Sequence, residues 1–273
     1  MSEIRQVGVV GAGIMGHGIA QVTATAGYDV IVTDIEAEAL AVGIGKIERQ
    51  LARAVEKGRA TQEDADAIRA RISETMDPAD LAGCDFVIEA ITESLEGKLA
   101  LWAELDRVVK PEAIFATNTS SLAVIDQAAA TSRPSQFLGV HYFNPAPVMK
   151  LVEVIRAVTT SDATFEAARA FVTAQGKLAI GTRDGAGFIV NRLLVPYMID
   201  GIRGLEEGIG SVGEIDAAMK AGAGHPMGRW PSATSSGSTR WGRSAIRCGR
   251  SSASPASPSR RPCASSSPRA GLA

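Results

Sequence analysis

The chain has 273 residues, a hydrophobic content of 45% and a formal net charge of −2 at pH 7. This length allows a large core and two domains, and the small net charge gives no reason to expect nucleic acid or a membrane as a partner. No apolar run reaches the length of a membrane span. The three cysteines lack metal-site spacing, and the first predicted strand begins near residue 4. We therefore expect a cytoplasmic protein without a metal site or signal peptide.

A glycine-rich turn lies near the N-terminus, between a predicted strand and a predicted helix. The apolar run over residues 4–10 is typical of a buried strand in a parallel sheet. It leads into Gly11, Gly13 and Gly16, spaced G-x-G-x-x-G, and a helical pattern then runs to about residue 26. In dinucleotide-binding turns, the first glycine makes the tight turn and the second lets a pyrophosphate approach the backbone. The third lets the helix pack closely, with its N-terminus facing the phosphates.

The next predicted strand, over residues 29–33, ends at Asp34. This carboxylate stands close to the spacing at which an acid accepts the ribose 2′-hydroxyl of NAD. It would repel the 2′-phosphate of NADP, so the sequence predicts NAD as the cofactor. An ordinary glycine-rich turn is the alternative, but it leaves the strand, helix and acid in this order unexplained.

Helices and strands continue to alternate along the chain. This pattern predicts an α/β fold with a Rossmann-type, doubly wound, mostly parallel sheet, followed by a smaller all-α domain. The further predicted strands cover residues 86–88, 113–116, 137–140, 151–155 and 178–181. The further predicted helices cover residues 36–57, 61–71, 94–109, 162–175, 188–207 and 213–221. We place the NAD-binding domain at 1–183, a partial C-terminal domain for substrate and dimerisation at 184–228, and an atypical tail at 229–273.

Polar side chains occur where the predicted strands end, at the edge of a parallel sheet that carries ligands. Glu89 and Glu93 follow one strand, and residues 117–121 follow another with hydroxyls and an amide that either cap a helix or serve a site. His141 follows the next strand, and Glu153 lies on the strand after it. A carboxylate bonded to one imidazole nitrogen raises the basicity of the ring and leaves the other nitrogen to take a proton. A purely structural histidine is the alternative interpretation.

Six segments in this order resemble the L-3-hydroxyacyl-CoA dehydrogenases, above all the short-chain, 3-hydroxybutyryl-CoA type. Together they extend over most of residues 1–228. The segments are Gly11-Ala12-Gly13-Ile14-Met15-Gly16 with Asp34, Glu89-Ala90-Ile91-Thr92-Glu93, Asn118-Thr119-Ser120-Ser121, His141-Tyr142-Phe143-Asn144-Pro145, Gly187-Phe188-Ile189-Val190-Asn191-Arg192 and Gly224-His225-Pro226-Met227-Gly228.

The resemblance implies an enzyme that interconverts (S)-3-hydroxyacyl-CoA and 3-oxoacyl-CoA with NAD and forms a homodimer. His141 would be the general base in the oxidation, and Glu153 would orient the imidazole and balance its charge. Ser120 and Asn191 would hydrogen-bond the substrate oxygens near C3.

The resemblance also implies which residues contact the cofactor and coenzyme A. Lys57 and Lys98 would lie toward coenzyme A, although the basic helix face that carries Lys57 is by itself typical of a solvated surface. The implied cofactor-binding residues are Gly11, Ala12, Gly13, Ile14, Met15, Gly16, Asp34, Glu93, Lys98, Ser120 and Asn144.

The composition changes abruptly after Gly228. Residues 229–273 contain eight Arg and thirteen Ser but no Asp, Glu or Lys, and they show no helical or strand period. Such a segment is typical of a basic, disordered tail, for which nucleic-acid binding is one function. The family continues instead with an apolar helix that pairs subunits, so we hypothesise that the tail is a frameshift product. Loss of that helix would remove the dimer interface and expose the preceding helices.

Two other functions fit the same residues. The first is a fragment that binds NAD without turnover, because the C-terminal helices are lost. The second is a dehydrogenase of a free hydroxy acid or sugar acid on the same scaffold. Turnover of acetoacetyl-CoA and of the free acids distinguishes these functions.

Overall fold

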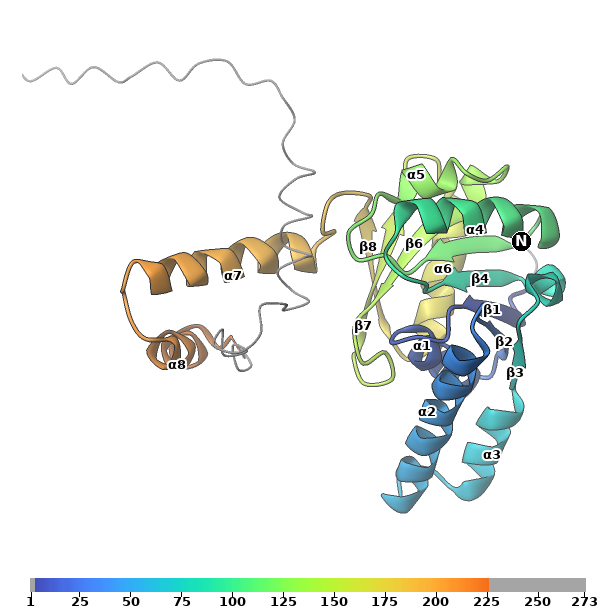
Figure 1. Ribbon diagram of the computed structural model, residues 1–273, viewed down its shortest axis with the longest axis horizontal. Coiled ribbons are helices and arrows are strands. Elements are labelled where there is room, and N and C mark those ends of the chain that lie inside the picture. Colours follow the sequence, from blue (N-terminus) through green and yellow to red (C-terminus); the bar gives the residue numbers. More distant parts are fainter. Residues whose placement is uncertain (1–2, 226–273) are drawn as a thin grey trace, which may run out of the picture.

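The computed structural model describes residues 3–225 of the chain. Figure 1 shows a central sheet covered by helices, with two further helices, α7 and α8, that follow the last strand. The predictions about the tail, both its disorder and its frameshifted origin, concern residues outside the described part of the chain.

The described elements follow the predicted alternation of strands and helices. The strands are β1 (Gln6–Val10), β2 (Asp29–Thr33), β3 (Ile72–Thr75), β4 (Phe86–Glu89), β5 (Ile114–Thr117), β6 (Phe137–Tyr142), β7 (Leu151–Arg156) and β8 (Leu178–Arg183). The α-helices are α1 (Gly16–Thr25), α2 (Ala37–Glu56), α3 (Gln62–Ala70), α4 (Leu95–Val108), α5 (Val124–Ala128), α6 (Asp162–Ala174), α7 (Val190–Glu206) and α8 (Val212–Ala223). Two short 3-10 helices are η1 (Pro78–Gly83) and η2 (Pro134–Gln136).

The eight strands form one sheet in the order β3-β2-β1-β4-β5-β6-β7-β8. Neighbouring strands are parallel except β6 and β7, which form an antiparallel pair. The chain runs outward from β1 through β2 to β3, and then returns to β4 on the other side of β1. This reversal makes a switch point at the carboxyl ends of β1 and β4, where ligands bind in doubly wound folds. The predicted fold class is therefore confirmed.

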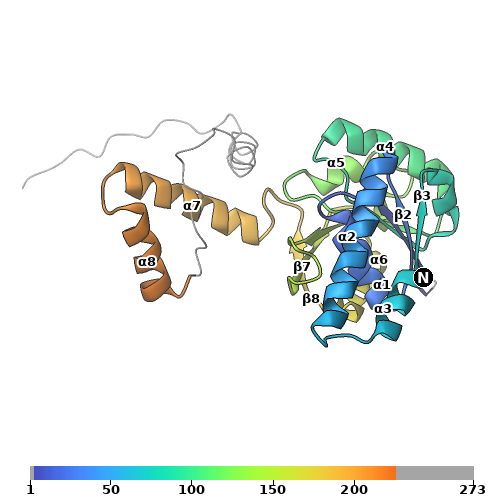
Figure 2. The same ribbon diagram turned by 60° about the horizontal axis from the view of Figure 1, so that its bottom comes forward.

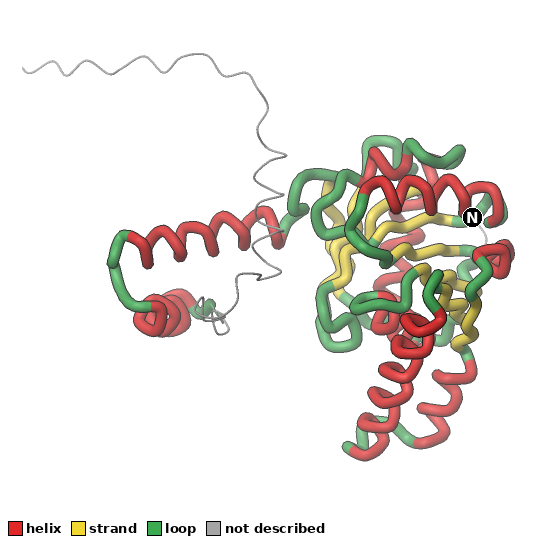
Figure 3. The backbone as a smooth tube through the Cα atoms, in the orientation of Figure 1, coloured by secondary structure: helices red, strands yellow, loops and turns green. Residues whose placement is uncertain are grey.

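Each face of the sheet has its own apolar core. On one face, side chains such as Val9 and Ile88 pack with residues of α1, α2, α3 and α6. On the other face, Val87 and Phe115 pack with Trp102 of α4 and with α5. The side chains of consecutive strand residues thus point into opposite cores, as the two-residue period of a strand requires. Figure 3 shows the strands in yellow between these helices.

Helices α7 and α8 stand apart from the sheet and its covering helices, as Figures 1 and 2 agree. Gly204 is the one buried residue of α7, whereas Leu193 is 70% exposed. Ile209 and Val212, at the turn into α8, are also exposed. Within the described residues, these helices therefore present apolar surface outward.

The predicted elements match the structure except in a few places. No range was predicted for β3, α5, η1 or η2, and residues 117–121 do not act as a helix cap. Strand β3 was not predicted, because Ile72 is the only fully buried residue in its four-residue span and no alternation is visible. Residues 117–121 do not cap α5, whose N-cap residue Ala123 makes no side-chain hydrogen bond. Instead, the Thr119 hydroxyl accepts hydrogen bonds from the amides of Ser121 and Leu122 and shapes the loop.

Candidate active site

The three glycines of the N-terminal turn differ in the space around them. Gly11 has a φ of +98°, and a Cβ atom there would lie 2.7 Å from the carbonyl oxygen of Ala90. A Cβ at Gly16 would lie 1.6 Å from the carbonyl oxygen of Gly11, so α1 can start at this place only with a glycine. Gly13 has no atom within 4 Å of its ideal Cβ position. The turn therefore leaves open space at the residue where the backbone of such turns approaches a phosphate.

Asp34, directly after β2, fixes this turn from the side. Its Oδ2 accepts a hydrogen bond from the amide of Ala12 at 2.8 Å, and its Oδ1 accepts one from the amide of Glu36 at 3.2 Å. Met15 is the N-cap residue of α1, and Ile14 is exposed. The first turn of α1 holds no acidic side chain, so the positive end of its dipole is free to face an anion. These residues fit a dinucleotide with its pyrophosphate at the turn.

Helix α2 contributes a contact to the turn that the sequence analysis missed. A Cβ at Gly43 would lie 2.5 Å from the carbonyl oxygen of Ala12, so this glycine lets α2 lie directly against the turn. The sequence did hold one sign of this contact. Gly43 stands within the apolar stripe of a predicted helix, where alanine would stabilise the helix by about 1 kcal/mol more than glycine.

His141 and Glu153 lie directly opposite each other on β6 and β7. The imidazole Nδ1 is 2.7 Å from Glu153 Oε2, and both side chains are buried. The predicted pairing on neighbouring strands is therefore present, on the sheet face that also buries Phe137 and Ile155. A carboxylate can only accept, so Nδ1 carries the hydrogen and the other ring nitrogen, Nε2, has the lone pair of the neutral imidazole.

The second oxygen of Glu153 holds the start of α7. Its Oε1 accepts hydrogen bonds from the amides of Ile189 at 3.0 Å and Val190 at 2.9 Å. Burial alone would raise the pKa of Glu153, but the bonds from His141, Val190 and Ile189 together hold that pKa below its usual range. Glu153 therefore remains ionised at neutral pH and couples the histidine to the first turn of α7.

Two phenylalanine rings flank the imidazole of His141. The ring of Phe143 lies 4.4 Å away and that of Phe188 lies 5.6 Å away, measured between centroids. Phe188 has a φ of +51°, which is uncommon for a residue with a side chain, and it follows Gly187 at +76°. Backbone strain of this kind clusters at functional sites, where surrounding contacts hold it.

The predicted cofactor residue Glu93 is the partly exposed member of an otherwise buried charge network. Its Oε1 accepts hydrogen bonds from Thr119 Oγ1 at 2.5 Å and from the amide of Ser120 at 3.0 Å. Lys98 Nζ lies 2.9 Å from Glu93 Oε2 and 2.8 Å from an oxygen of Glu89. Burial raises the pKa of Glu89, and the neighbouring Lys98 only partly opposes this effect. Burial would also raise the pKa of Glu93, but Lys98 and the donors of Thr119 and Ser120 outweigh it. The pKa of Glu93 is therefore lowered.

Ser120 and Asn191 meet where the sheet joins α7. The side-chain amide of Asn191 lies 3.5 Å from the carbonyl oxygen of Ser120, which makes this a long and weak hydrogen bond. Asn118, two residues earlier, accepts a hydrogen bond from the amide of Tyr142 and joins the end of β5 to the end of β6. The structure thus brings the loop after β5 close to His141 and to the start of α7.

Three predicted site residues are not grouped around His141. Two of them, Lys57 and Asn144, are exposed elsewhere, and Lys98 is buried. Lys57 is exposed at the C-terminal end of α2, which points away from the sheet in Figure 1. Asn144 is exposed in the loop between β6 and β7. Lys98 is completely buried, so in this arrangement it reaches a ligand only through Glu93.

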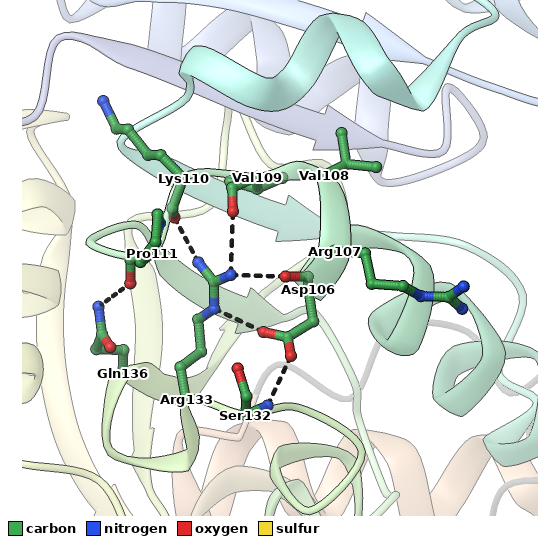
Figure 4. A pocket seen from close by; sticks show the side chains of 9 residues that line it. All are labelled: Asp106, Arg107, Val108, Val109, Lys110, Pro111, Ser132, Arg133 and Gln136. Atoms are coloured by element: carbon green, nitrogen blue, oxygen red, sulfur yellow. Dashed lines mark hydrogen bonds and ion pairs between the residues drawn. The ribbon is translucent and has the colours of Figure 1, made fainter.

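A hollow shown in Figure 4 lies at the amino ends of β5 and β6, away from these residues. Arg133 fills one side of it and donates hydrogen bonds to the carbonyl oxygens of Asp106 and Val109, near the end of α4. Its Nε donates to the carboxylate of Asp106 at 2.7 Å, and the guanidinium lies over the ring of Phe115. This arginine therefore caps a helix and is not available to a ligand.

Other proteins are similar to this chain in sequence and in fold. Residues 6–185 match the family model of the 3-hydroxyacyl-CoA dehydrogenase NAD binding domain, and residues 187–239 match that of the C-terminal domain. A 3-hydroxybutyryl-CoA dehydrogenase of Bradyrhizobium diazoefficiens is 49% identical over 225 residues, which are 82% of this chain and 77% of that protein. One from Mycobacterium tuberculosis strain H37Rv is 43% identical over 82% of this chain and 79% of its own length.

A solved structure agrees with these sequence similarities. The crystal structure of an (S)-3-hydroxybutyryl-CoA dehydrogenase from Ralstonia eutropha superimposes with a TM-score of 0.81 at 42% identity. The superposition covers 82% of this chain and 79% of that one. Within the described residues, no helix combines the length and apolarity needed to cross a bilayer, and no cluster of ligating side chains is arranged for a metal ion.

Proposed function

We propose a catalytic mechanism for this chain, which belongs to the 3-hydroxyacyl-CoA dehydrogenase family. The enzyme oxidises a short-chain (S)-3-hydroxyacyl-CoA, such as 3-hydroxybutyryl-CoA, to the 3-oxoacyl-CoA with NAD, and it catalyses the reverse reaction. The names of its relatives support the substrate class. The observation that carries the mechanism is the 2.7 Å hydrogen bond between His141 Nδ1 and Glu153 Oε2 at the ligand-binding edge of the sheet.

His141 moves the proton of the reaction. Because Glu153 accepts from Nδ1, the Nε2 atom is the basic nitrogen, and it takes the hydroxyl proton as C3 of the substrate loses its hydride. NAD, when bound, supplies the hydride acceptor. In the reverse direction Nε2 returns the proton to the oxygen. The buried, ionised Glu153 stabilises the imidazolium that forms in between.

The surrounding residues position the two ligands. Ser120 and Asn191 hydrogen-bond the substrate oxygens near C3, which is consistent with their meeting at the start of α7. Glu93 and Asn144 contact the nicotinamide half of the cofactor, while Asp34 accepts the ribose 2′-hydroxyl beside the glycine turn. Orienting both reactants in this way supplies a large part of the rate.

The two lysines have different roles in this proposal. Lys57 offers a charge to the coenzyme A phosphates from the exposed end of α2. Lys98 is buried between carboxylates, so we assign it an indirect role in which it holds Glu93.

The purified full chain tests the substrate class directly. NADH absorbance is followed with acetoacetyl-CoA and, in matched reactions, with free acetoacetate and other free oxo acids. We expect oxidation of NADH with the thioester only. Turnover of a free acid alone would favour the free-acid dehydrogenase. NADH binding without turnover of any substrate would favour the inactive fragment, an alternative supported by the exposed apolar surface of α7 and α8.

The homodimer and the cytoplasmic location predicted from the sequence are part of this proposal. The exposed apolar side chains of Leu193 and Ile202 on α7 support a subunit interface there. Light scattering after size-exclusion chromatography measures the mass in solution. A monomer at micromolar concentration would contradict the homodimer.

A further inference from the structure

Glu89 is a buried carboxylate to which the proposed mechanism gives no role. It is the last residue of β4, at the switch point of the sheet, and its exposed fraction is 0%. Its Oε1 accepts a hydrogen bond from the amide of Ile91 at 2.8 Å, and its Oε2 accepts one from Thr117 Oγ1 at 2.7 Å. Lys98 Nζ lies 2.8 Å from Oε1 and 2.9 Å from Oε2. An ammonium and an amide can only donate, so these partners suit a carboxylate rather than a carboxylic acid.

Lys98 connects this hidden carboxylate to the edge of the site. Its ammonium is shared between Glu89 and Glu93, and it is itself fully buried. The Glu93 side chain is 31% exposed, so it is the member of the network that a ligand can reach. Two carboxylates and one ammonium carry a net charge of −1, and the exposed end of that charge is Glu93.

We propose that Glu89 is a positioning residue that offsets the positive charge of Lys98, so that the network keeps a net negative charge, exposed through Glu93, at the nicotinamide end of the cofactor site. This inference rests on the proposed function, which places Glu93 beside the nicotinamide half. The nicotinamide ring is cationic in NAD⁺ and neutral in NADH. The network therefore stabilises bound NAD⁺ relative to bound NADH.

The ratio of the two dissociation constants measures this effect without any turnover. In Glu89→Gln, Lys98 pairs with Glu93 alone, and the net charge of the network falls from −1 to zero. We expect Kd(NAD⁺)/Kd(NADH) to rise by about tenfold, as the loss of one unit charge in a partly buried site implies. Calorimetry gives the first constant and NADH fluorescence gives the second, both on the full chain.

Matched variants separate charge from packing. Thr117→Val removes one neutral hydrogen bond to Glu89 and should leave the ratio within about twofold, as should Glu89→Asp, which keeps the charge. Equal shifts in Glu89→Gln and Thr117→Val would overturn the inference, because packing would then be the cause. So would an unchanged ratio in a folded Glu89→Gln.

A further variant covers the case in which Glu89→Gln does not fold. Glu93→Gln removes the exposed charge, and the same rise in the ratio is expected, whereas an unchanged ratio would overturn the inference. If Glu93→Gln shifts the ratio and a folded Glu89→Gln does not, the inference about Glu89 fails while the cofactor site stands. If the unaltered chain binds neither nucleotide, the proposed function itself fails.

Discussion

Glu153 bonds His141 with one carboxylate oxygen and the first amides of α7 with the other. A single buried side chain therefore orients the proposed base and fixes the point where the helical segment leaves the sheet. The proposed proton transfer and the placement of α7 are therefore linked through this residue.

Glu153→Gln tests the first half of this link. The glutamine fits the same space but lacks the charge that stabilises the imidazolium, and its amide group can bond Nδ1 in the wrong tautomer. We expect kcat with acetoacetyl-CoA to fall by about a hundredfold or more. Glu166→Gln is the control, because Glu166 pairs with Arg169 on the exposed surface of α6. A decrease of less than threefold in Glu153→Gln would contradict the pairing.

The pH dependence of stability tests the ionisation of Glu153. Its pKa is lowered in the folded protein by the bonds from His141, Val190 and Ile189, which outweigh burial. The stabilisation is therefore complete above the pKa of the unfolded chain, about 4.3, and is lost as the pH falls through the lower pKa of the folded protein. Urea unfolding should show Glu153→Gln less stable by about 1–3 kcal/mol at pH 7. The gap should narrow at pH 3, and a constant gap would contradict the assignment.

Two alanine substitutions in the glycine turn should behave differently. Gly13→Ala places a methyl group in open space, so the fold should keep its stability while the group blocks the phosphates and weakens NADH binding by about tenfold or more. Gly16→Ala places the same group 1.6 Å from the Gly11 carbonyl oxygen and should unfold or displace α1. Thermal unfolding and NADH fluorescence are measured on both. Normal NADH affinity in Gly13→Ala would argue against a pyrophosphate at this turn.

Asp34→Ala tests the preference for NAD. We expect kcat/KM for NAD to fall by about tenfold to a hundredfold, as for the loss of a hydrogen bond to a charged group, while the value for NADP stays the same or rises. Glu36→Gln is the neighbouring control, because its exposed side chain makes no capping bond. Equal losses for both nucleotides in Asp34→Ala would show that the carboxylate acts only on the turn, through Ala12.

The frameshift hypothesis is tested on the nucleotide sequence around codon 229. We expect another reading frame there to encode an apolar helix like that of the family. If every alternative frame lacks such a helix, the tail belongs to the protein as it stands.

The sequence was sufficient for every strand of the sheet except β3, because glycine spacing and apolar runs are local signals and β3 carries neither. The pairing of His141 with Glu153 was expected, but their exact opposition depends on the antiparallel turn from β6 into β7, and no local pattern shows that direction. The roles of Glu89 and Gly43 were missed for a similar reason. Each acts through residues far along the chain or on another element, Thr117 and Lys98 in one case and Ala12 in the other. The backbone bonds from Ile189 and Val190 to Glu153 carry no side-chain signal at all.

The most direct test of the central claim is the turnover of His141→Ala with NADH and acetoacetyl-CoA. If Nε2 of His141 transfers the proton, kcat should fall by about a hundredfold to ten-thousandfold while the Kd of NADH stays within about twofold of that of the unaltered enzyme. Turnover within threefold of the unaltered enzyme, in a folded variant that binds NADH normally, would contradict the account.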